Sequence, residues 1–563
     1  MDILNIESSC INYCNRCEQA KKGPGCVGIK EENPETIFGV CGKTNIVSTR
    51  IDMINYFLNK YAEAMQGNTS KVSDASIRAI LVAGFSTITN TNFDADRLRL
   101  YAISVMDACN ADFGTSHVYP EDEAKCIQDN GYIHLLRERG EVLGGLIIYV
   151  EQGAYGSMAY AEHAVMESGT TEHIREHVIT LMDCFYQSKQ ATDVPTMLGV
   201  MAAAGAANLT ITQQLDDANF KSHGQQTFSH AELIPEAGKA CIIVSGHSLS
   251  DIKSLLEYIK EHNYEINVAT HGEMRRSHGQ EELRALGLKH HFGSSWSKQR
   301  SEFKNVPAAI LFTTNCIVKP LPSYADRVFT CNMVAMPGCE HIENRNWESI
   351  CQKALELGGF TAEDVARYEE KYASAGQNNK LLFGGGYRTV LEHAGKIVDL
   401  IKRGVIKRAI FIGGCESSTR TTYYKELGEN IPKDWLVLTA GCGSFLVNNN
   451  PALYGDFEGI PRVVDVGQCN DVFGAVQIAL ALQGALGGIP FDSFLSFSVS
   501  WFEGKALAWS LTLLAHLGIP LITLGPSLPR FLAPAVIDFL VENLKVSVIG
   551  DPKTDVETII SRM

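Results

Sequence analysis

The chain has 563 residues, of which 45% are hydrophobic and 20% are charged, and its formal net charge is −15. This length exceeds what one hydrophobic core can organise, so we expect about three domains of ordinary globular composition. The acidic balance argues against a nucleic-acid partner, which would select clustered positive charge. The N-terminus MDILNIESSCINYCNRC lacks the features of a secretory signal. No run of about 18 consecutive apolar residues is present, so no membrane partner is predicted and a cytoplasmic location is expected.

The first part of the chain predicts a helical domain behind a cysteine-rich leader. Residues 1–45 are rich in cysteine, and residues 46–232 carry apolar residues at helical spacing. One stretch repeats them at steps of three and four, which predicts an amphipathic helix: Ile51, Ile54, Leu58, Tyr61 and Met65. We therefore expect residues 46–232 to form a helical bundle.

The pattern changes near residue 235, where short apolar strands begin to alternate with amphipathic helices. This alternation predicts parallel sheets covered by helices. A polar run at residues 357–380 suggests a boundary, so we expect two Rossmann-like α/β domains at 233–372 and 373–563. The predicted fold class is thus a multidomain α + α/β protein.

Four cysteines lie ahead of the predicted helices, at Cys14, Cys17, Cys26 and Cys41. Close-set cysteines on a loop suit a soft thiolate site. Their spacing alone is compatible with structural zinc or with an iron–sulfur cluster. The absence of a secretory signal makes metal or redox chemistry a better explanation for the 16 cysteines of the chain than disulfide bonds.

Seven further candidate ligands each follow an apolar run that predicts a strand. In open α/β sheets, ligands bind outside the carboxyl ends of the strands. A set that mixes thiolates with imidazole and carboxylates indicates iron with a sulfur-rich half and an oxygen-rich half, rather than an electron-transfer cluster bound by cysteine alone. The seven residues are His247, Glu273, Cys316, Cys415, Cys442, Cys469 and Glu503.

The motifs around these residues resemble the hybrid cluster proteins, also called hydroxylamine reductases or prismane proteins, over nearly the whole chain. They include AYAEHA at 159–164 and, in chain order, VSGH, THGEM, NCIV, IGGC, TAGC, DVGQCND and SWFEGKA. The resemblance implies a helical first domain and two α/β domains, a fold shared with the nickel carbon monoxide dehydrogenases.

The resemblance also implies two cofactors. The four N-terminal cysteines would bind a [4Fe–4S] cluster, with [2Fe–2S] as the alternative because fourteen residues separate Cys26 from Cys41 where about five are expected. The seven strand-end residues would bind a hybrid [4Fe–2O–2S] cluster, and Cys415 occupies the position that carries a persulfide in the family. The segments that follow Cys415 and Cys442 also depart from the family pattern, which puts the substrate preference in question.

The function implied is the reduction of hydroxylamine to ammonia and water, with electrons supplied by a separate donor protein. Glu503 and Cys415 are candidate catalytic residues as well as ligands. Lys505, two positions after Glu503, is a candidate for polarising the leaving oxygen, and a structural ion pair is its alternative role. Three other functions stay open: reduction of nitric oxide to nitrous oxide in nitrosative-stress defence, protein S-nitrosylation, and a purely structural role for the metals.

Overall fold

The computed structural model divides the chain into two compact units. It describes residues 14, 16–17, 41–374, 380–383, 385–415, 422–500, 504–519, 522–525, 528–529, 531–532, 534–544 and 546–561. The first unit comprises Met1–Leu215, Trp501–Pro520 and Ser527–Ser547, and the second comprises Asp216–Ser500, Leu521–Pro526 and Val548–Met563. The boundaries between the four predicted segments stay a prediction.

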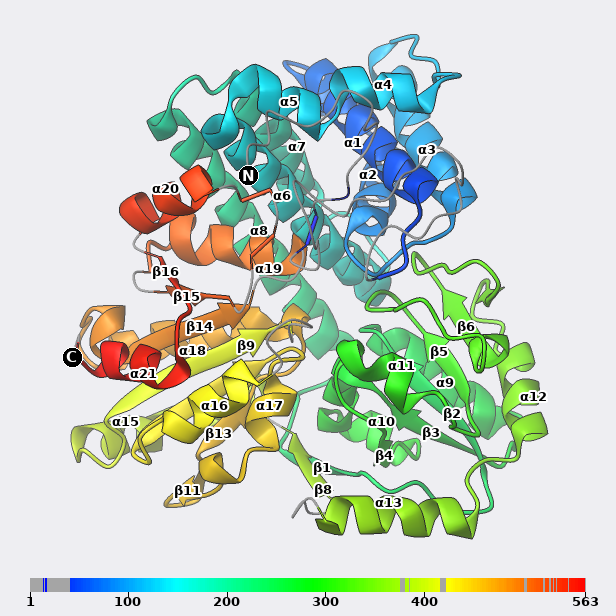
Figure 1. The fold of residues 1–563 in the computed structure, drawn as a ribbon, viewed down its shortest axis with the longest axis vertical. Coiled ribbons are helices and arrows are strands. Elements are labelled where there is room, and N and C mark those ends of the chain that lie inside the picture. Colours follow the sequence, from blue (N-terminus) through cyan, green and yellow to red (C-terminus); the bar gives the residue numbers. More distant parts are fainter. Residues whose placement is uncertain are drawn as a thin grey trace. The chain divides into compact units, whose positions relative to one another are not determined.

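The first unit is a helical bundle (Figure 1). The side chains predicted to form the apolar stripe of the first helix are all buried. Thr44 begins that helix by accepting a hydrogen bond from the Val47 amide. The helices that precede the second unit are α1 Asn45–Met65, α2 Asp74–Thr87, α3 Ala95–Phe113, α4 Glu123–Asn130, α5 Tyr132–Arg139, α6 Glu141–Ser168 and α7 Arg175–Gln190. Helix α8, Val194–His223, begins in the first unit, and its residues from Asp216 onward belong to the second.

Helix α6 is the central helix of this unit, since every residue from Gly144 to Val165 is buried. Three later elements pack in the same unit: α19 Gly504–Ser510, a π-helical turn Leu511–His516 and α20 Pro534–Leu544. Helix α19 approaches α6 so closely that a Cβ atom added at Gly156 would overlap the carbonyl oxygen of Gly504. Glycine at both positions therefore sets the distance between these helices.

Helix α8 is long and apolar enough, by length and composition alone, to cross a membrane, and no other helix in the described parts of the chain meets this test. Core helices of soluble proteins pass the same test. Within the first unit, Asn208 on α8 donates to the Thr512 hydroxyl at 2.9 Å and accepts from the Ser157 hydroxyl at 3.0 Å. The expected absence of a membrane span stays a prediction.

The second unit contains two sheets. The first has the strand order β7-β6-β5-β2-β3-β4-β1-β8 and is parallel except where β1 pairs with β8. Its last strand lies beyond the predicted boundary at residue 372. The strands are β1 Ser229–Glu232, β2 Ala240–Ser245, β3 Ile266–Thr270, β4 His290–His291, β5 Ala309–Phe312, β6 Val328–Cys331, β7 Glu340–Ile342 and β8 Lys380–Phe383.

The second sheet has the order β13-β10-β9-β14-β15-β16, and its pairs from β13 to β15 are parallel. A short antiparallel pair, β11 Asp456–Phe457 and β12 Ile460–Pro461, stands apart from it. The strands of the second sheet are β9 Arg408–Gly414, β10 Trp435–Ala440, β13 Val463–Asp465, β14 Leu495–Ser500, β15 Ile522–Leu524 and β16 Ser547–Val548.

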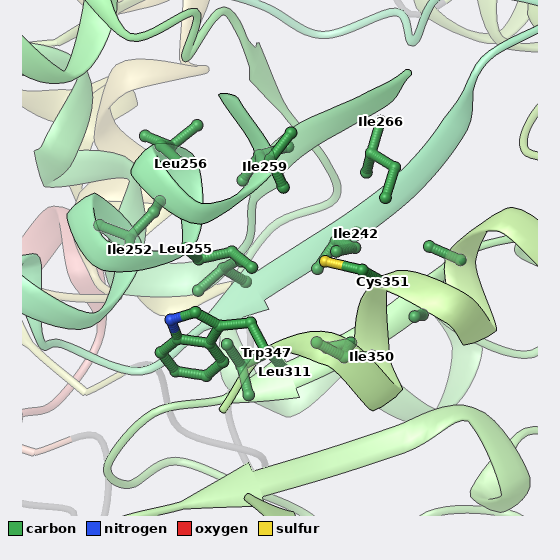
Figure 2. Close-up of a cluster of buried hydrophobic side chains, with 14 of the residues drawn as sticks. Ile242, Ile252, Leu255, Leu256, Ile259, Ile266, Leu311, Trp347, Ile350 and Cys351 are labelled. Carbon is green, nitrogen blue, oxygen red and sulfur yellow. The ribbon is translucent and has the colours of Figure 1, made fainter. Parts of the chain in front are cut away.

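Helices bury the apolar strands of both sheets. Figure 2 shows Leu255 and Ile259 of α9, with Trp347 and Ile350 beside and within α12, gathered over Ile242 of the first sheet. Such burial contributes about 1.5–3 kcal/mol for each large apolar side chain. The helices of this unit are α9 Leu249–Glu261, α10 Glu281–Ala285, α11 Gln299–Glu302, α12 Glu348–Leu357, α13 Ala362–Ser374, α14 Gly386–Glu392, α15 Ala394–Lys402, α16 Tyr423–Asn430, α17 Ser444–Asn448, α18 Val472–Ala485 and α21 Pro552–Ser561.

The predicted fold class is confirmed, with a helical first part followed by parallel sheets under helices. The polar run at 357–380 is largely helical, because α13 occupies most of it. Helix α13 has no buried residue, which explains why its sequence reads as a linker.

Candidate metal centre

Three adjacent strands of the first sheet lead into predicted ligands. His247 follows β2, and Glu273 follows β3 in the 3₁₀ turn η3, Gly272–Gly279. Cys316 follows β5, which pairs with β2 on the side opposite β3. Parallel strands end at one edge of a sheet, and the crevice outside that edge opens where the strand order reverses. Because β5, β2 and β3 are parallel, these three residues lie at the same edge of the sheet. The strand order reverses at β2, which places them at the crevice.

The second sheet repeats this arrangement. Cys415 follows β9, Cys442 follows β10, and Cys469 follows β13 as the first residue of the 3₁₀ turn η7, Cys469–Asp471. The strand order β13-β10-β9-β14 also reverses at β9. Glu503, predicted to follow β14, lies outside the described residues, so its position stays a prediction.

His247, Glu273 and Cys469 converge, although they come from different sheets. Their ligand atoms lie within 4.8 Å of one another. The His247 Nε2 atom is 3.1 Å from Glu273 Oε2 and 3.4 Å from Cys469 Sγ. The side chains of His247 and Glu273 are 1% and 2% exposed, whereas Cys469 is half-buried, so the imidazole and the carboxylate are almost closed to solvent and the thiol is partly exposed.

The segment around Cys469 forms hydrogen bonds with His247 and Glu273, the two members of the close group that come from the first sheet. The Gln468 side-chain amide donates to the carbonyl oxygen of His247 at 3.2 Å and to that of Glu273 at 3.1 Å. The Cys469 amide donates to Glu273 Oε2 at 2.7 Å. Gln468 thus holds the backbones of two predicted ligands while its neighbour holds the carboxylate of one.

Two consecutive arginines add charge-assisted bonds between the sheets. Arg276 in η3 makes a bidentate ion pair with Asp471 in η7. Its Nε atom lies 2.9 Å from Asp471 Oδ2, and its Nη2 atom lies 3.1 Å from Oδ1. Arg275 lies 2.7 Å from Asp465 and stacks over the Phe445 ring. These arginines therefore fasten the Glu273 turn to the ends of β10 and β13.

Two neutral histidines contact Thr270, at the end of the strand that leads into the same turn. The Thr270 hydroxyl lies 2.9 Å from His278 Nε2 and 2.9 Å from His291 Nδ1. Burial lowers the pKa of His278 to about 3 and holds that of His291 well below its usual value, so both rings stay neutral. The positive charge of η3 thus comes from its two arginines and not from His278.

Cys316, Cys415 and Cys442 do not belong to the close group of three. Cys316 has a left-handed backbone with φ of 68°, and the Asn315 side-chain amide donates to its sulfur at 3.3 Å. The loop of Cys442 is tied to that of Cys415, since the Gly443 amide donates to the Gly414 carbonyl at 2.8 Å. Cys415 and Cys442 are both buried.

The N-terminal motif is described in part. Cys14, Cys17 and Cys41 are buried, whereas Cys26 lies outside the described residues. Burial raises the pKa of the Cys41 thiol, and the nearby Lys43 ammonium opposes that shift. Arg16 between the first two cysteines pairs with Asp52 and lies over the Tyr132 ring. A buried group of thiols beside cations suits a bound anionic cluster.

Lys505 is buried in the first unit. Its Nζ atom lies 3.3 Å from His163 Nε2 and 5.4 Å from the ring centres of both Phe85 and Tyr160. His163 belongs to the AYAEHA motif, but no role was predicted for it. Nor were roles predicted for Gln468, Arg276 and Asp471, which lie in the GQCND and THGEMRR segments beside the ligands. The signal in the sequence that could identify Gln468, Arg276 and Asp471 is their position within three residues of a predicted ligand.

Comparison with known proteins identifies the family. A model of the Prismane/CO dehydrogenase family matches residues 12–557. The chain belongs to this family. The hydroxylamine reductase of Maridesulfovibrio salexigens is 35% identical over 97% of this chain and 100% of that relative. The hydroxylamine reductase of Zymomonas mobilis is 34% identical over 96% of this chain and 97% of that relative.

Solved structures support the same fold. Carbon monoxide dehydrogenase IV from Carboxydothermus hydrogenoformans matches with a TM-score of 0.56 and 17% identity, over 99% of this chain and 93% of that one. An acetyl-CoA synthase/carbon monoxide dehydrogenase with NiZn[Fe4S4] and NiNi[Fe4S4] clusters matches with a TM-score of 0.53, 15% identity and coverage of 99% and 88%. At this identity the likeness concerns the fold alone.

The residues present fit a metal centre of mixed ligands. An imidazole, a carboxylate and a thiol lie within 4.8 Å of one another, and nitrogen, oxygen and sulfur donors together suit iron. Desolvating a carboxylate beside a thiolate is costly unless a cation joins them. The donor set and the burial of His247 and Glu273 therefore fit a bound metal, and a purely structural role for that metal stays an open alternative.

Proposed function

We propose that this protein is an iron–sulfur oxidoreductase that reduces hydroxylamine to ammonia and water. The reaction consumes two electrons and two protons for each N–O bond broken. The observation that carries the proposal is the convergence of His247, Glu273 and Cys469 at the strand ends of two sheets, in a family whose full-length relatives are named hydroxylamine reductase.

The chain offers two sets of cofactor ligands. We assign Cys14, Cys17, Cys26 and Cys41 to an electron-transfer cluster, [4Fe–4S] or [2Fe–2S]. We assign His247, Glu273, Cys316, Cys415, Cys442, Cys469 and Glu503 to the hybrid [4Fe–2O–2S] cluster. When bound, this second group supplies electrons and a Lewis-acidic iron to the substrate. Each ligand must be deprotonated to bind, which the buried cysteines achieve only beside positive charge.

Lys505 and His163 are the chain's candidates for handling protons. With 3.3 Å between Lys505 Nζ and His163 Nε2, a proton can be held on either nitrogen. Lys505 is our candidate for polarising the leaving oxygen because it stands two residues after the predicted ligand Glu503 in the sequence, and His163 would return a proton to it. The rings of Phe85 and Tyr160 lie at cation–π distance from the Lys505 nitrogen.

The proposal includes a separate electron-donor protein, since the GxGxxG match GPGCVG at 23–28 lies in the cysteine-rich leader and follows no apolar run that predicts a strand, as a nicotinamide site would require. It also includes a cytoplasmic location. Nitric oxide is the alternative substrate, and transfer of a nitrosyl group to partner thiols is the alternative activity. Both would use the same ligands, so they become outcomes of one experiment.

The test is anaerobic turnover of hydroxylamine and, separately, of nitric oxide by iron-loaded protein with an artificial one-electron donor. We expect ammonia from hydroxylamine in a 1:1 ratio, and its loss in Glu273→Gln, whose amide is a poorer ligand. Asp217→Asn, a change at an exposed residue outside the site, serves as the control.

Nitrous oxide formed much faster than ammonia would transfer the function to nitric oxide reduction. Labelled nitric oxide recovered on a partner thiol, with neither product released, would favour the modifier role.

A further inference from the structure

Two of the three separations within the group of three are close to those around a single metal ion. A zinc-like ion lies about 2.0–2.3 Å from nitrogen, oxygen and sulfur ligands, so tetrahedral neighbours lie about 3.3–3.6 Å apart. The His247 Nε2 atom is 3.1 Å from Glu273 Oε2 and 3.4 Å from Cys469 Sγ. The third separation, between the Glu273 carboxylate and the Cys469 sulfur, is within 4.8 Å. The three donors are therefore near enough for one ion to contact them all after a small adjustment.

The polypeptide itself maintains these separations. Gln468 binds the carbonyl oxygens of His247 and Glu273, and the Cys469 amide binds the Glu273 carboxylate. The His247 amide in turn donates to the Thr314 hydroxyl at 3.1 Å. The pair Arg276–Asp471, with both side chains under a tenth exposed, joins the turns from which the carboxylate and the thiol project. None of these bonds uses a ligand atom of a bound metal except the Glu273 oxygen.

The other predicted ligands of the same centre are arranged differently. Cys316, Cys415 and Cys442 lie at neighbouring strand ends but outside the close group. A metal ion bound by the group of three would need no sulfur from them. Bringing their thiolates to the same centre calls for further metal or sulfide, whereas the group of three needs one ion.

We propose that His247, Glu273 and Cys469 bind one divalent metal ion in the cluster-free chain, with Gln468 as their positioning residue, and that assembly of the larger centre begins there. The ion is of the borderline class that accepts nitrogen, oxygen and sulfur together, such as Fe²⁺, and Co²⁺ and Zn²⁺ are analogues. Binding would displace the thiol proton of Cys469 into solvent, leaving the metal's oxidation state unchanged. The inference rests on the proposed metal centre and not on the reaction carried out there.

The test is a titration of metal-free, reduced, full-length protein with cobalt(II) chloride under anaerobic conditions. The starting protein carries the substitutions Cys14→Ser, Cys17→Ser, Cys26→Ser and Cys41→Ser, so that the N-terminal thiols do not bind cobalt. We expect one equivalent of Co²⁺ to bind, with thiolate-to-cobalt absorption in the near ultraviolet and d–d bands of tetrahedral strength.

Gln468→Leu is expected to lower the affinity about 10–100-fold, as loss of an orienting partner does. Glu273→Gln, which preserves size, should lower it by at least about tenfold.

Two comparisons decide the result. Cys442→Ser, a change in the same predicted centre outside the close group, should retain the parent's cobalt spectrum, and so should the exposed Asp217→Asn. Failure of the parent to bind one Co²⁺ with thiolate absorption would overturn the inference. So would a loss of affinity in Cys442→Ser as large as that in Glu273→Gln, because all ligands would then act together. If Gln468→Leu does not fold, judged by circular dichroism, Glu273→Gln against Cys442→Ser still decides. Normal cobalt binding in this titration, together with no turnover of hydroxylamine by the iron-loaded protein with its N-terminal cysteines intact, would refute the proposed function but leave this inference standing.

Discussion

The two units of this protein position their functional side chains by different physical means. In the first unit, α19 reaches α6 through two glycines, and the residue after Gly504 is Lys505. In the second, the turns that carry Glu273 and Cys469 are joined by a buried ion pair and by the amide of Gln468. Helices satisfy their own backbone polar groups, so they can be placed by shape alone. Irregular turns after strands need polar partners from elsewhere, and this difference predicts how each unit should fail.

The largest expected effect is the loss of the buried ion pair in the second unit. Asp471→Asn leaves the Arg276 guanidinium without its carboxylate, and breaking a buried pair in this way costs about 3–5 kcal/mol. We expect that loss in the free energy of urea unfolding of the metal-free protein. Asp217→Asn, which removes a half-exposed partner of Arg388, should cost less than about 1 kcal/mol. Equal losses in the two variants would contradict the role given to charge.

Removing the Lys505 ammonium should affect chemistry more than folding. Lys505→Met retains an unbranched apolar chain among Phe85 and Tyr160, and loss of a positioned acid typically slows a reaction about 10²-fold or more. We expect this fall in kcat for hydroxylamine, with KM and bound iron unchanged. A fall in iron content matching the fall in kcat would instead make Lys505 a structural residue, the other role considered for it.

Adding a methyl group at the helix crossing tests positioning by shape. Gly156→Ala would force a Cβ atom onto the Gly504 carbonyl, and overpacking of this kind costs about 1–3 kcal/mol. Thermal unfolding should record the loss. In Gly199→Ala, on α8, the added Cβ atom meets nothing within 4 Å, so this variant should be neutral or slightly more stable. Similar behaviour of the two variants would show that the crossing is not sterically determined.

The smallest expected effect concerns a buried acid in the first unit. Burial raises the pKa of Glu162 to about 7, although the Arg78 guanidinium 2.6 Å away opposes the shift. The folded protein therefore binds this proton more tightly than the unfolded chain, and stability decreases as the pH rises toward 7. Glu162→Gln should remove about 1 kcal/mol of this decrease between about pH 6 and pH 7. Unfolding midpoints across that range, compared with the parent protein, measure it, and parallel curves would contradict the raised pKa.

Much of the second unit follows from short-range sequence pattern. Apolar strands alternating with helices imply parallel pairing, and parallel pairing places His247, Glu273 and Cys316 at one edge of a sheet. That argument predicts which residues share an edge but not which come within a few ångströms. The close group joins His247 to Cys469, 222 residues apart, through the relation between two sheets.

The supporting residues were not predictable for a related reason. Gln468 acts through backbone carbonyls, which carry no signature in the sequence of the residues it binds. His163 and Lys505 are 342 residues apart and meet only because α19 packs in the helical unit. The parts predicted for Cys26 and Glu503 stay predictions, since both lie outside the described residues.

The left-handed backbone of Cys316 sets folding against function at one position. A non-glycine residue with φ of 68° bears a strain of about 1–2 kcal/mol, whereas glycine adopts this conformation without strain. Glycine also loses more entropy on folding, which offsets about 0.5–1 kcal/mol of that gain. Cys316→Gly should therefore leave the metal-free protein as stable as the parent or slightly more so in urea unfolding, while removing a sulfur ligand. Selection for foldability alone would favour glycine here, so the presence of a thiol at this position supports the proposal that Cys316 is a metal ligand.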